Sequence, residues 1–474
     1  MRNKTFESVP LLKVAICLMV GIVVREYVVV PLPLLPVLAG LVVVALLLWR
    51  YEHLQSVTIA GCFIVLGMLL TERQKASLHI VWPEGEVCFE AVVLTEPIEK
   101  PKTMAVDILL PTSHQQLKCY LYKDQRSRGL TVGDGLRIQS RIRSDSQSVR
   151  TFVASWKWQK VRLSLKDLSR LERTRLWFLR LRSRLLRRLG DRMDHEAYAV
   201  IAAMTLGDKS ALTRELKETY AVTGASHILA LSGLHLGIIY MLLSFLVMGR
   251  RWQMMSQLLV ILGIWMFVFL VGLSISVVRS AVMLTVYALL SLGHRDRMSV
   301  NTLAFTAIVM LMLSPLTLFD VGFQMSYMSV FSILLFMPLS ERVFSQQYMM
   351  SHRLIRWLWG MVSVSCSAQI GVAPLIAYYF GRFSTFFLLT NFIVVPTAVL
   401  ILYLSLVVFL VPSLSFLLYS VVSWLNAILS YIAAIPGASI GGLHPSILQV
   451  SMVYVIIMAS YLLVCRLLEQ QHYQ

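Results

Sequence analysis

Long apolar runs, separated by short polar links, occupy most of this chain. A run of about 20 residues has the length that an α-helix needs to cross the hydrocarbon core of a bilayer. The runs are Val9–Val24, Val28–Trp49, Leu54–Leu70, 226–248, 256–273, 276–293, 299–316, 321–338, 358–379, 384–410, 414–435 and 447–466. The pattern predicts a polytopic α-helical membrane protein of about twelve spans, in which runs interrupted by glycine or proline could be broken or re-entrant helices.

A long polar interval, 71–195, separates the first three runs from the other nine. Its alternation predicts short strands at 86–94, 103–110, 116–123, 134–143 and 150–162. Five short strands favour a small β-barrel, with an OB-fold as the natural candidate and a generic β-sandwich as the alternative. The predicted domains are a membrane segment at 1–70, an external OB-like β domain at 71–165, a basic amphipathic helix at 166–195 and a membrane channel domain at 196–474.

Composition supports this class and suggests an orientation. Of the 474 residues, 57% are hydrophobic and 14% are charged, and a soluble domain cannot bury that much apolar surface. If the spans alternate, most basic residues of the short loops fall on one side, so both termini are expected in the cytoplasm and 71–195 outside. The stretch Met1–Pro10 does not have the features of a cleavable signal peptide.

The polar interval is also basic. Residues 71–195 contain 25 basic and 14 acidic residues, a net charge of +11, and almost all of that excess falls after residue 149. Basic surface on the outer side of a membrane runs against the usual charge bias. It therefore predicts an anionic extracytoplasmic partner.

The last predicted strand interleaves aromatic and cationic side chains. These are Phe152, Trp156, Lys157, Trp158, Lys160 and Arg162. Aromatic rings that stack on bases, beside cations that pair with phosphates, are typical of sequence-tolerant sites for single-stranded nucleic acid. The alternative is that Trp156 and Trp158, at a spacing of two, share a buried or membrane-surface face.

Residues 166–192 have the pattern of an amphipathic helix. Leucines recur on one face, and Arg173, Arg180, Arg184 and Arg187 fall near another. Such a helix can lie in a membrane interface on anionic lipid, or its arginines can contact DNA directly. Both hold if the arginines surround a pore entrance.

Two of the six cysteines, Cys88 and Cys119, fall in the external module. An oxidising compartment would permit a disulfide between them, worth roughly 3–4 kcal/mol for a loop of about 30 residues. The other four lie in or near apolar runs, where packing is the simpler role. No His/Cys spacing predicts a structural metal, and no cofactor is expected.

Several polar residues interrupt the apolar runs of the membrane domain. They are His227, Ser232, Gly233, His235, Arg279, Asp320, Gln324, Gln369 and Asn391. Polar groups at membrane depth usually face one another or an aqueous path, so we expect these residues to line a channel. Purely structural alternatives are an ion pair between Arg279 and Asp320, and hydrogen bonds from His227, Ser232 and His235 that tighten the helix bundle.

The motifs in this region resemble the ComEC competence-protein family, the inner-membrane channels of bacterial DNA uptake. The resemblance rests on ordered segments between about 190 and 465: 227–237 (HILALSGLHLG), 279–283 (RSAVM), 320–326 (DVGFQMS), 369–374, 380–384, and Asn391 with Pro396. It implies a channel that passes single-stranded DNA through the inner membrane in natural transformation. It also implies separate partners: an extracytoplasmic DNA receptor, a cytoplasmic DNA-handling motor and a nuclease.

Many members of that family carry a C-terminal metallo-β-lactamase-like domain. No His-x-His-x-Asp-His run occurs in this sequence, so we do not expect an enzyme. Three other functions stay open: a secondary transporter or flippase for a small or lipid-linked anion, an intramembrane hydrolase using Ser232 with His235, and a non-conducting anchor of an uptake assembly.

Overall fold

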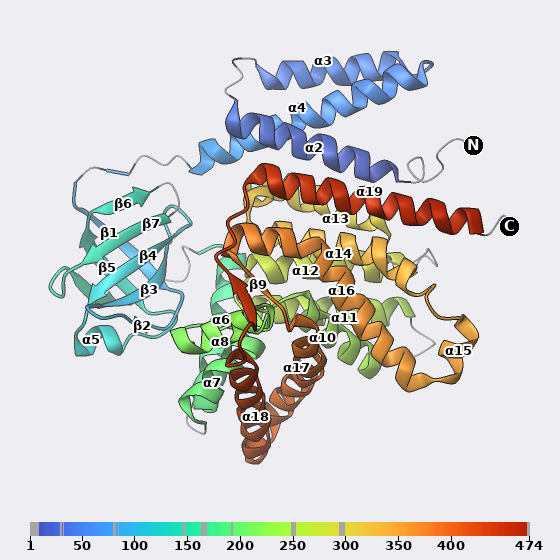
Figure 1. Ribbon diagram of the computed structural model, residues 1–474. Coiled ribbons are helices and arrows are strands. Elements are labelled where there is room, and N and C mark those ends of the chain that lie inside the picture. The colour runs from blue at the N-terminus through green and yellow to red at the C-terminus, as the bar shows by residue number, and fades with distance from the viewer. Residues whose placement is uncertain are drawn as a thin grey trace.

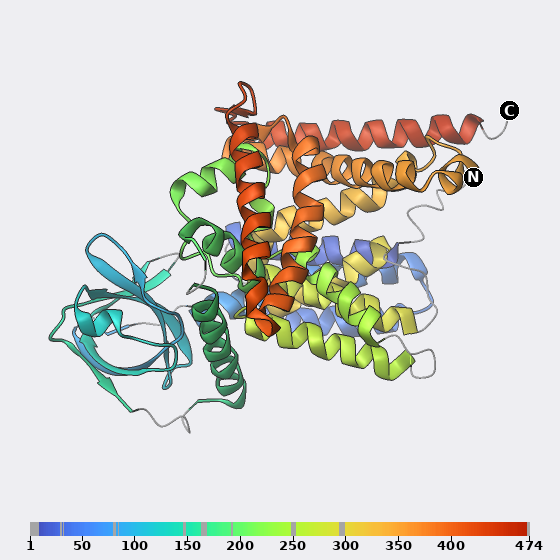
Figure 2. The same cartoon turned by 90° about the horizontal axis from the view of Figure 1, so that it is seen from below.

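The computed structural model describes residues 9–28, 31, 33–78, 82–83, 85–145, 148–162, 168–190, 193–247, 253–292 and 299–471. A small β domain lies at one end of a large helical body (Figure 1). In the helical body, α2 begins and α19 ends at the end away from the β domain, and both views agree on this (Figures 1 and 2).

The N-terminal segment is a group of three helices, α2 (Pro10–Tyr27), α3 (Leu34–Leu47) and α4 (Glu52–Leu78), in which α2 and α4 run parallel and α3 runs antiparallel to both. Glycines let α2 and α4 approach with their backbones nearly in contact. A Cβ atom on Gly21 would lie 2.0 Å from the Ile64 carbonyl oxygen, and one on Gly67 would lie 2.5 Å from that of Leu18. Such small-residue contacts are typical of helices that pack within membranes.

The β domain is one strongly curled sheet, and a separate two-stranded sheet lies elsewhere in the chain. The strands are β1 (Val87–Val93), β2 (Ile98–Glu99), β3 (Thr103–Leu110), β4 (Gln115–Tyr122), β5 (Gly135–Ser140), β6 (Ile142–Asp145), β7 (Ser148–Val153) and β8 (Trp158–Val161), with α5 (Gln125–Arg128) after β4. Their order is β6-β7-β4-β3-β1-β5-β8, with β2 beside β3, and β4 pairs with β7 in parallel. Each of the five predicted strands overlaps at least one observed strand.

The sheet curls because β5 and β6, which form one almost continuous segment, lie near opposite ends of the strand order. Only Arg141 separates β5 from β6; β5 pairs with β1, whereas β6 pairs with β7. Alternate residues therefore point into a common core, which includes Leu117, Leu121, Ile138 and Val153.

Helix α6 (Arg170–Gly190) lies between the β domain and the helical body (Figure 2). Leu176 and Leu179 pack with apolar residues of the β domain, while Leu186 and Leu189 join the core of the membrane domain. Protein, and not lipid, therefore covers this apolar face of the predicted interfacial helix. Phe178 also stacks on Phe269 with ring centroids 5.7 Å apart.

The membrane domain follows as a larger set of helices. They are α7 (His195–Ile201), the π-helix η2 (Ala202–Leu206), α8 (Arg214–Val222), α9 (Ser226–Leu229), α10 (Gly233–Val247), α11 (Gln253–Leu270), α12 (Ile275–Leu292), α13 (Val300–Leu313), the 3-10 helix η4 (Pro315–Phe319), α14 (Val321–Ser340), α15 (Gln346–Ser351), α16 (Arg353–Phe380), α17 (Phe387–Leu410), the 3-10 helix η5 (Pro412–Leu414), α18 (Ser415–Ala433) and α19 (Ile447–Gln471). The antiparallel pair of β9 (Arg382–Ser384) and β10 (Ser439–Gly441) joins the α16–α17 connection to the α18–α19 connection.

A helix occupies each of the twelve predicted runs, but they do not all have the character of simple spans. Six are long and apolar enough to cross a membrane: α4, α14, α16, α17, α18 with η5, and α19. Five shorter apolar helices are α3, α10, α11, α12 and α13. In both views α17 and α18 run across the direction of α2 and α19 (Figures 1 and 2).

Candidate functional site

The candidate site in the membrane domain is built on a helix that breaks. The predicted run 226–248 is divided into the four-residue α9 and the longer α10, with 230–232 in irregular conformation between them. Gly224 precedes the break with φ of 82°, and a Cβ atom there would lie 3.0 Å from the Ser384 Cβ. Glycine at this position therefore permits both a left-handed backbone and a close approach to β9.

His235 is fully buried and folds back onto Ser232. Its Nδ1 lies 3.3 Å from the Ser232 amide nitrogen, which donates to it, and 3.1 Å from Ser232 Oγ. A side chain in the first turn that accepts from the amide before the helix acts as the glutamate of a capping box does. His235 thus secures the start of α10, and its Nε2 is buried without a partner among the described residues.

His227 lies on the other side of the break and is anchored separately. Its Nδ1 lies 3.0 Å from the Gly224 carbonyl oxygen. Gly233, at the first position of α10, faces α12, because a Cβ atom there would lie 3.2 Å from Ser280 Oγ. The predicted residues of this segment therefore lie around one backbone break.

Arg279, the neighbour of Ser280 on α12, points toward the start of α14. Its Nη1 lies 3.6 Å from Asp320 Oδ1, and its Nη2 donates to Ser276 Oγ at 3.4 Å. Asp320 also accepts the Phe323 amide hydrogen bond at 2.8 Å, so the same carboxylate caps α14. The ion pair named among the sequence-based alternatives is present.

Gln324 is held by two groups. It donates through Nε2 to the Leu318 carbonyl at 3.0 Å, and its Oε1 accepts from the Tyr379 hydroxyl at 2.7 Å. Tyr379 was not among the predicted site residues. Its place within an apolar helix, next to Tyr378, is the sequence signal that could have found it.

Asn391 and Gln369 both lie near Ser365 of α16. Asn391 on α17 donates to Ser365 Oγ on α16 at 3.4 Å. Gln369 lies one turn beyond Ser365 on α16, on the same face, and is half-buried. The two predicted residues therefore lie near the contact between α16 and α17.

Several other polar atoms of the membrane domain are buried without a hydrogen-bond partner in the described part of the chain. They are Ser244 Oγ, Gln257 Oε1, Arg279 Nε, Ser363 Oγ, Ser384 Oγ and Thr390 Oγ1. Buried polar groups in folded proteins are nearly always hydrogen-bonded, so such a group calls for an explanation. Ser384, which lies against Gly224, shows that part of this set adjoins the helix break.

The external candidates divide into exposed and enclosed residues. Trp156 is 82% exposed and Phe152 is 52% exposed, whereas Trp158 is 4% exposed and belongs to the domain core. Trp158 therefore cannot stack on a base, which corrects that part of the prediction. Its register opposite Ile138 turns it inward.

The lysines of this strand are engaged in ion pairs, and Arg162 is exposed. Lys157 pairs with Glu86, and Lys160 Nζ lies 2.7 Å from Asp134 Oδ2. Burial raises the pKa of Asp134, but hydrogen bonds from Lys160 and the Thr131 amide outweigh it and hold that pKa below its ordinary value. These lysines stabilise the domain, so they are less available to phosphates.

The four predicted arginines of α6 also contact protein groups. Arg180 donates to the carbonyls of Val132 and Gly133, Arg187 pairs with Glu96 at 3.1 Å, Arg173 donates to the Leu168 carbonyl, and Arg184 donates to that of Arg180. Arg180 and Arg187 thus hold α6 against the β domain, whereas Arg173 and Arg184 bond to carbonyls just before or within the helix.

Cys88 and Cys119 do not form the predicted disulfide. Both are free thiols, Cys88 exposed and Cys119 buried. They lie on β1 and β4, which are separated by β3, and adjacent strands are about 4.8 Å apart. Two strand spacings exceed the distance that a disulfide can bridge. Burial raises the pKa of the Cys119 thiol.

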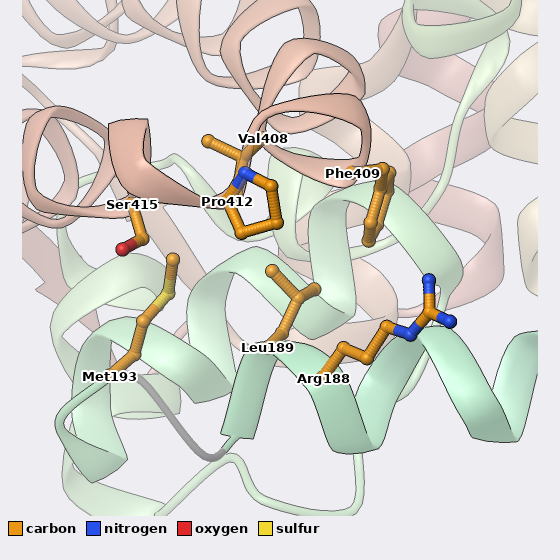
Figure 3. Close-up of a pocket in the computed structure, with 7 residues that line it drawn as sticks. All are labelled: Arg188, Leu189, Met193, Val408, Phe409, Pro412 and Ser415. Atoms are coloured by element: carbon orange, nitrogen blue, oxygen red, sulfur yellow. The ribbon is translucent and has the colours of Figure 1, made fainter.

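Two cavities lie away from the polar break. One of about 220 Å³ lies between the end of α6 and the α17–α18 connection, and is lined by Arg188, Leu189, Met193, Val408, Phe409, Pro412 and Ser415 (Figure 3). Another of about 130 Å³ lies between α14, α16 and α19. Among the described residues, no group of three or more His, Cys, Asp or Glu side chains could hold a metal ion.

Comparison with known proteins decides the family. The family model described as "Competence protein" matches residues 204–467, more than half of the chain. The chain belongs to the competence protein family. It is 29% identical over 310 residues to ComE operon protein 3 of Bacillus subtilis (strain 168) and 26% identical over 265 residues to an uncharacterized protein of Aquifex aeolicus (strain VF5).

These matches cover 61% and 55% of this chain, but 37% and 56% of the two relatives, so the chain spans only part of their length. No solved structure matches the chain. The region matched to the competence family contains the broken helix and all nine predicted channel residues. The β domain and α6 lie before the matched range.

Proposed function

We propose that this chain is a channel that carries single-stranded DNA through the bacterial cytoplasmic membrane during natural transformation. The observation that carries the proposal is the match of 204–467 to the competence family, within which a membrane helix breaks at a cluster of histidine, serine and glycine. Irregular backbone at membrane depth is tolerated where protein or an aqueous path surrounds it.

The residues at the break suit passage of a polyanion. His227, Ser232 and His235 offer hydrogen bonds, and α10 begins there with the positive end of its dipole. Arg279 adds a cation on α12. Asp320, a carboxylate, would repel DNA, but it pairs with Arg279 and caps α14, so we assign it a supporting role. Gln324, Gln369 and Asn391 complete the proposed polar lining.

The orientation follows from charge and shape. The β domain lies at the opposite end of the helical body from the start of α2 and the end of α19, and the positive-inside rule favours cytoplasmic termini (Figure 1). The β domain would then meet DNA outside. Its parallel β4–β7 pair, with α5 between β4 and β5, supports the OB-like assignment.

The proposal assigns no catalytic step to the chain. A receptor that delivers DNA from outside, a cytoplasmic motor and a separate nuclease would supply the remaining steps of uptake. The competing proposal is a transporter or flippase for a small or lipid-linked anion, for which buried Arg279 would serve as the anion ligand.

The test is entry of DNA into the cytoplasm of a competent host from which the gene has been deleted. The deletion is expected to abolish transformation while DNA binding at the cell surface persists. Restoration should succeed with wild type and with His352→Ala, an exposed histidine used as the matched control, but not with His235→Ala at an equal membrane level. Unchanged transformation after deletion would contradict the proposal and favour the small-anion transporter.

A further inference from the structure

The outer face of the curled sheet carries an organised set of aromatic and cationic side chains. On β4 the side chains of Leu117, Cys119 and Leu121 enter the core, so Lys118 and Tyr120 point outward. On β7, Val153 enters the core and Thr151 is buried, so the alternate residues Arg150 and Phe152 point outward. Sequence spacing alone does not bring these residues together, because 25 residues (123–147) separate the two strands.

Parallel pairing of β4 with β7 places two aromatic rings side by side. Tyr120 and Phe152 are partners in the register, and their rings stack with centroids 4.9 Å apart and an interplanar angle of 15°. Lys100 Nζ lies 4.9 Å from the centre of the Tyr120 ring. Phe152 keeps half of its surface exposed. An apolar ring would normally be covered, so its exposure in a stacked pair suggests a ligand with a flat face.

A second row, two residues along the same strands, is cationic. The register pairs Arg143 with Arg150 across β6 and β7, and Arg150 with Lys118 across β7 and β4. Asp107 on β3 is the next residue in this row. Lys118 and Arg143 thus place two exposed cations on either side of Arg150, where phosphates of one strand can pair with both.

The cations of this face differ from the lysines of β8. In the described part of the chain, Lys118, Arg141 and Arg143 have no ion pair, and all three are exposed. Arg141 follows the register of β6 to a position beside Phe152. Lys157 and Lys160, by contrast, are paired with carboxylates.

We propose that this outer face, which we call the stacking face and define as Lys118, Tyr120, Arg141, Arg143 and Phe152, binds single-stranded DNA. Bases would stack on the Tyr120–Phe152 row, and phosphates would pair with the cationic row about 6.6 Å away along the strands. Stacking requires a base, which distinguishes this ligand from a lipid headgroup. The choice of DNA rests on the proposed function.

The test uses the whole protein in nanodiscs of neutral lipid and a fluorescent oligothymidylate of about 20 nucleotides, with binding read by anisotropy. Phe152→Ala is expected to weaken binding about fivefold to 150-fold, the range for loss of one stacked base, while Phe152→Tyr should bind as wild type does. Trp177→Ala is the matched control, since this aromatic residue is exposed to a similar extent (55%) and lies on α6, outside the stacking face.

Two further measurements separate stacking from simple charge attraction. Lys118→Gln with Arg143→Gln should flatten the dependence of log affinity on log salt by roughly 1.4, about 0.7 for each lost phosphate contact. Unlabelled oligothymidylate should displace the probe better than polyphosphate with an equal number of phosphates. Wild-type affinity in Phe152→Ala, or equal displacement by polyphosphate, would overturn the stacking face.

Failure of the stacking-face proposal can be told apart from failure of the channel proposal. Binding by the purified protein tests the stacking face whether or not DNA is transported. Loss of transformation on gene deletion, together with normal binding by Phe152→Ala, would keep the channel and overturn the stacking face. Normal transformation on deletion, together with weak binding by Phe152→Ala, would overturn the channel and keep the stacking face.

Discussion

Arg279 Nη1 lies 3.6 Å from Asp320 Oδ1, and the two side chains differ sharply in exposure, 3% for the arginine and 43% for the aspartate. The buried guanidinium of Arg279 is thus paired with a carboxylate that is itself partly exposed. Because Asp320 also caps α14, one side chain links the position of α12 to the start of α14.

Asp320→Asn should separate these two roles. Asparagine retains a good helix cap but removes the charge, so the variant should lower the thermal unfolding temperature by leaving Arg279 uncompensated. The loss should be smaller than the roughly 3–5 kcal/mol of a fully buried pair, since Asp320 is partly exposed. Glu218→Gln at the exposed pair with Arg382 is the control and should have little effect. An unchanged unfolding temperature in Asp320→Asn would show that the charge contributes nothing.

Ser232→Ala should be tolerated better than His235→Ala. The His235 ring still accepts from the Ser232 amide when the hydroxyl is removed, and loss of the single hydrogen bond between the hydroxyl and the ring costs about 0.5–1.5 kcal/mol. Transformation frequency should therefore fall partially with Ser232→Ala and to the level of the deletion with His235→Ala. A hydrolase that used the serine as its nucleophile would lose all activity in both variants, and that result would contradict the channel assignment.

Gly371→Ala should destabilise the contact between α14 and α16. A Cβ atom there would lie 2.7 Å from the Met328 carbonyl oxygen and 2.6 Å from the Ser332 Cβ. Forcing these helices apart should cost about 1–3 kcal/mol, measured as thermal unfolding in detergent. Gly360→Ala on the same helix meets nothing within 4 Å and should be neutral or stabilising by up to ~1 kcal/mol. Equal behaviour of the two variants would refute close packing at Gly371.

The β domain should lose stability in acid through Asp134. Its pKa is held below the ordinary value, so the stabilisation is fully present above the unfolded-state pKa of about 3.9 and is lost as pH falls through the lower folded-state value. Urea unfolding at a series of pH values, followed by labelling of buried Cys119 with a dithiodipyridine that reacts in acid, should show this decline.

Asp134→Asn should reduce that acid dependence and lower stability near neutral pH, because Lys160 loses its partner. Glu196→Gln, an exposed carboxylate outside the β domain, is the matched control and should leave the Cys119 labelling profile unchanged. The same acid slope in Asp134→Asn as in wild type would show that other carboxylates carry the effect.

Local pattern predicted the elements well. Apolar runs marked every helix of the membrane domain that contains a candidate residue, and alternation located β1, β3 and β4 within one residue, whereas 134–143 spans β5 and the start of β6, and 150–162 spans most of β7 and all of β8. The glycine, serine and histidine of 224–237 indicated the broken helix, because glycine permits positive φ and the polar side chains can satisfy the backbone at a helix end. Each of these features depends on residues close together in the chain.

Only the tertiary structure shows which residues far apart in the sequence lie in contact. Alternation showed that Trp156 and Trp158 share a spacing of two, but only strand pairing placed Trp158 in the core. The insertion of β3 between β1 and β4 separated Cys88 from Cys119, and burial of α6 between two domains covered a face predicted for lipid.

The sequence by itself thus determined the membrane class, the placement of helices and strands, and the resemblance to the competence family, because periodicity and short motifs record local backbone geometry and one-sided burial. Tertiary structure decided which side chains meet: Arg279 with Asp320, Gln324 with Tyr379, and Tyr120 with Phe152. Such contacts depend on the register and packing of distant segments, which no local pattern specifies.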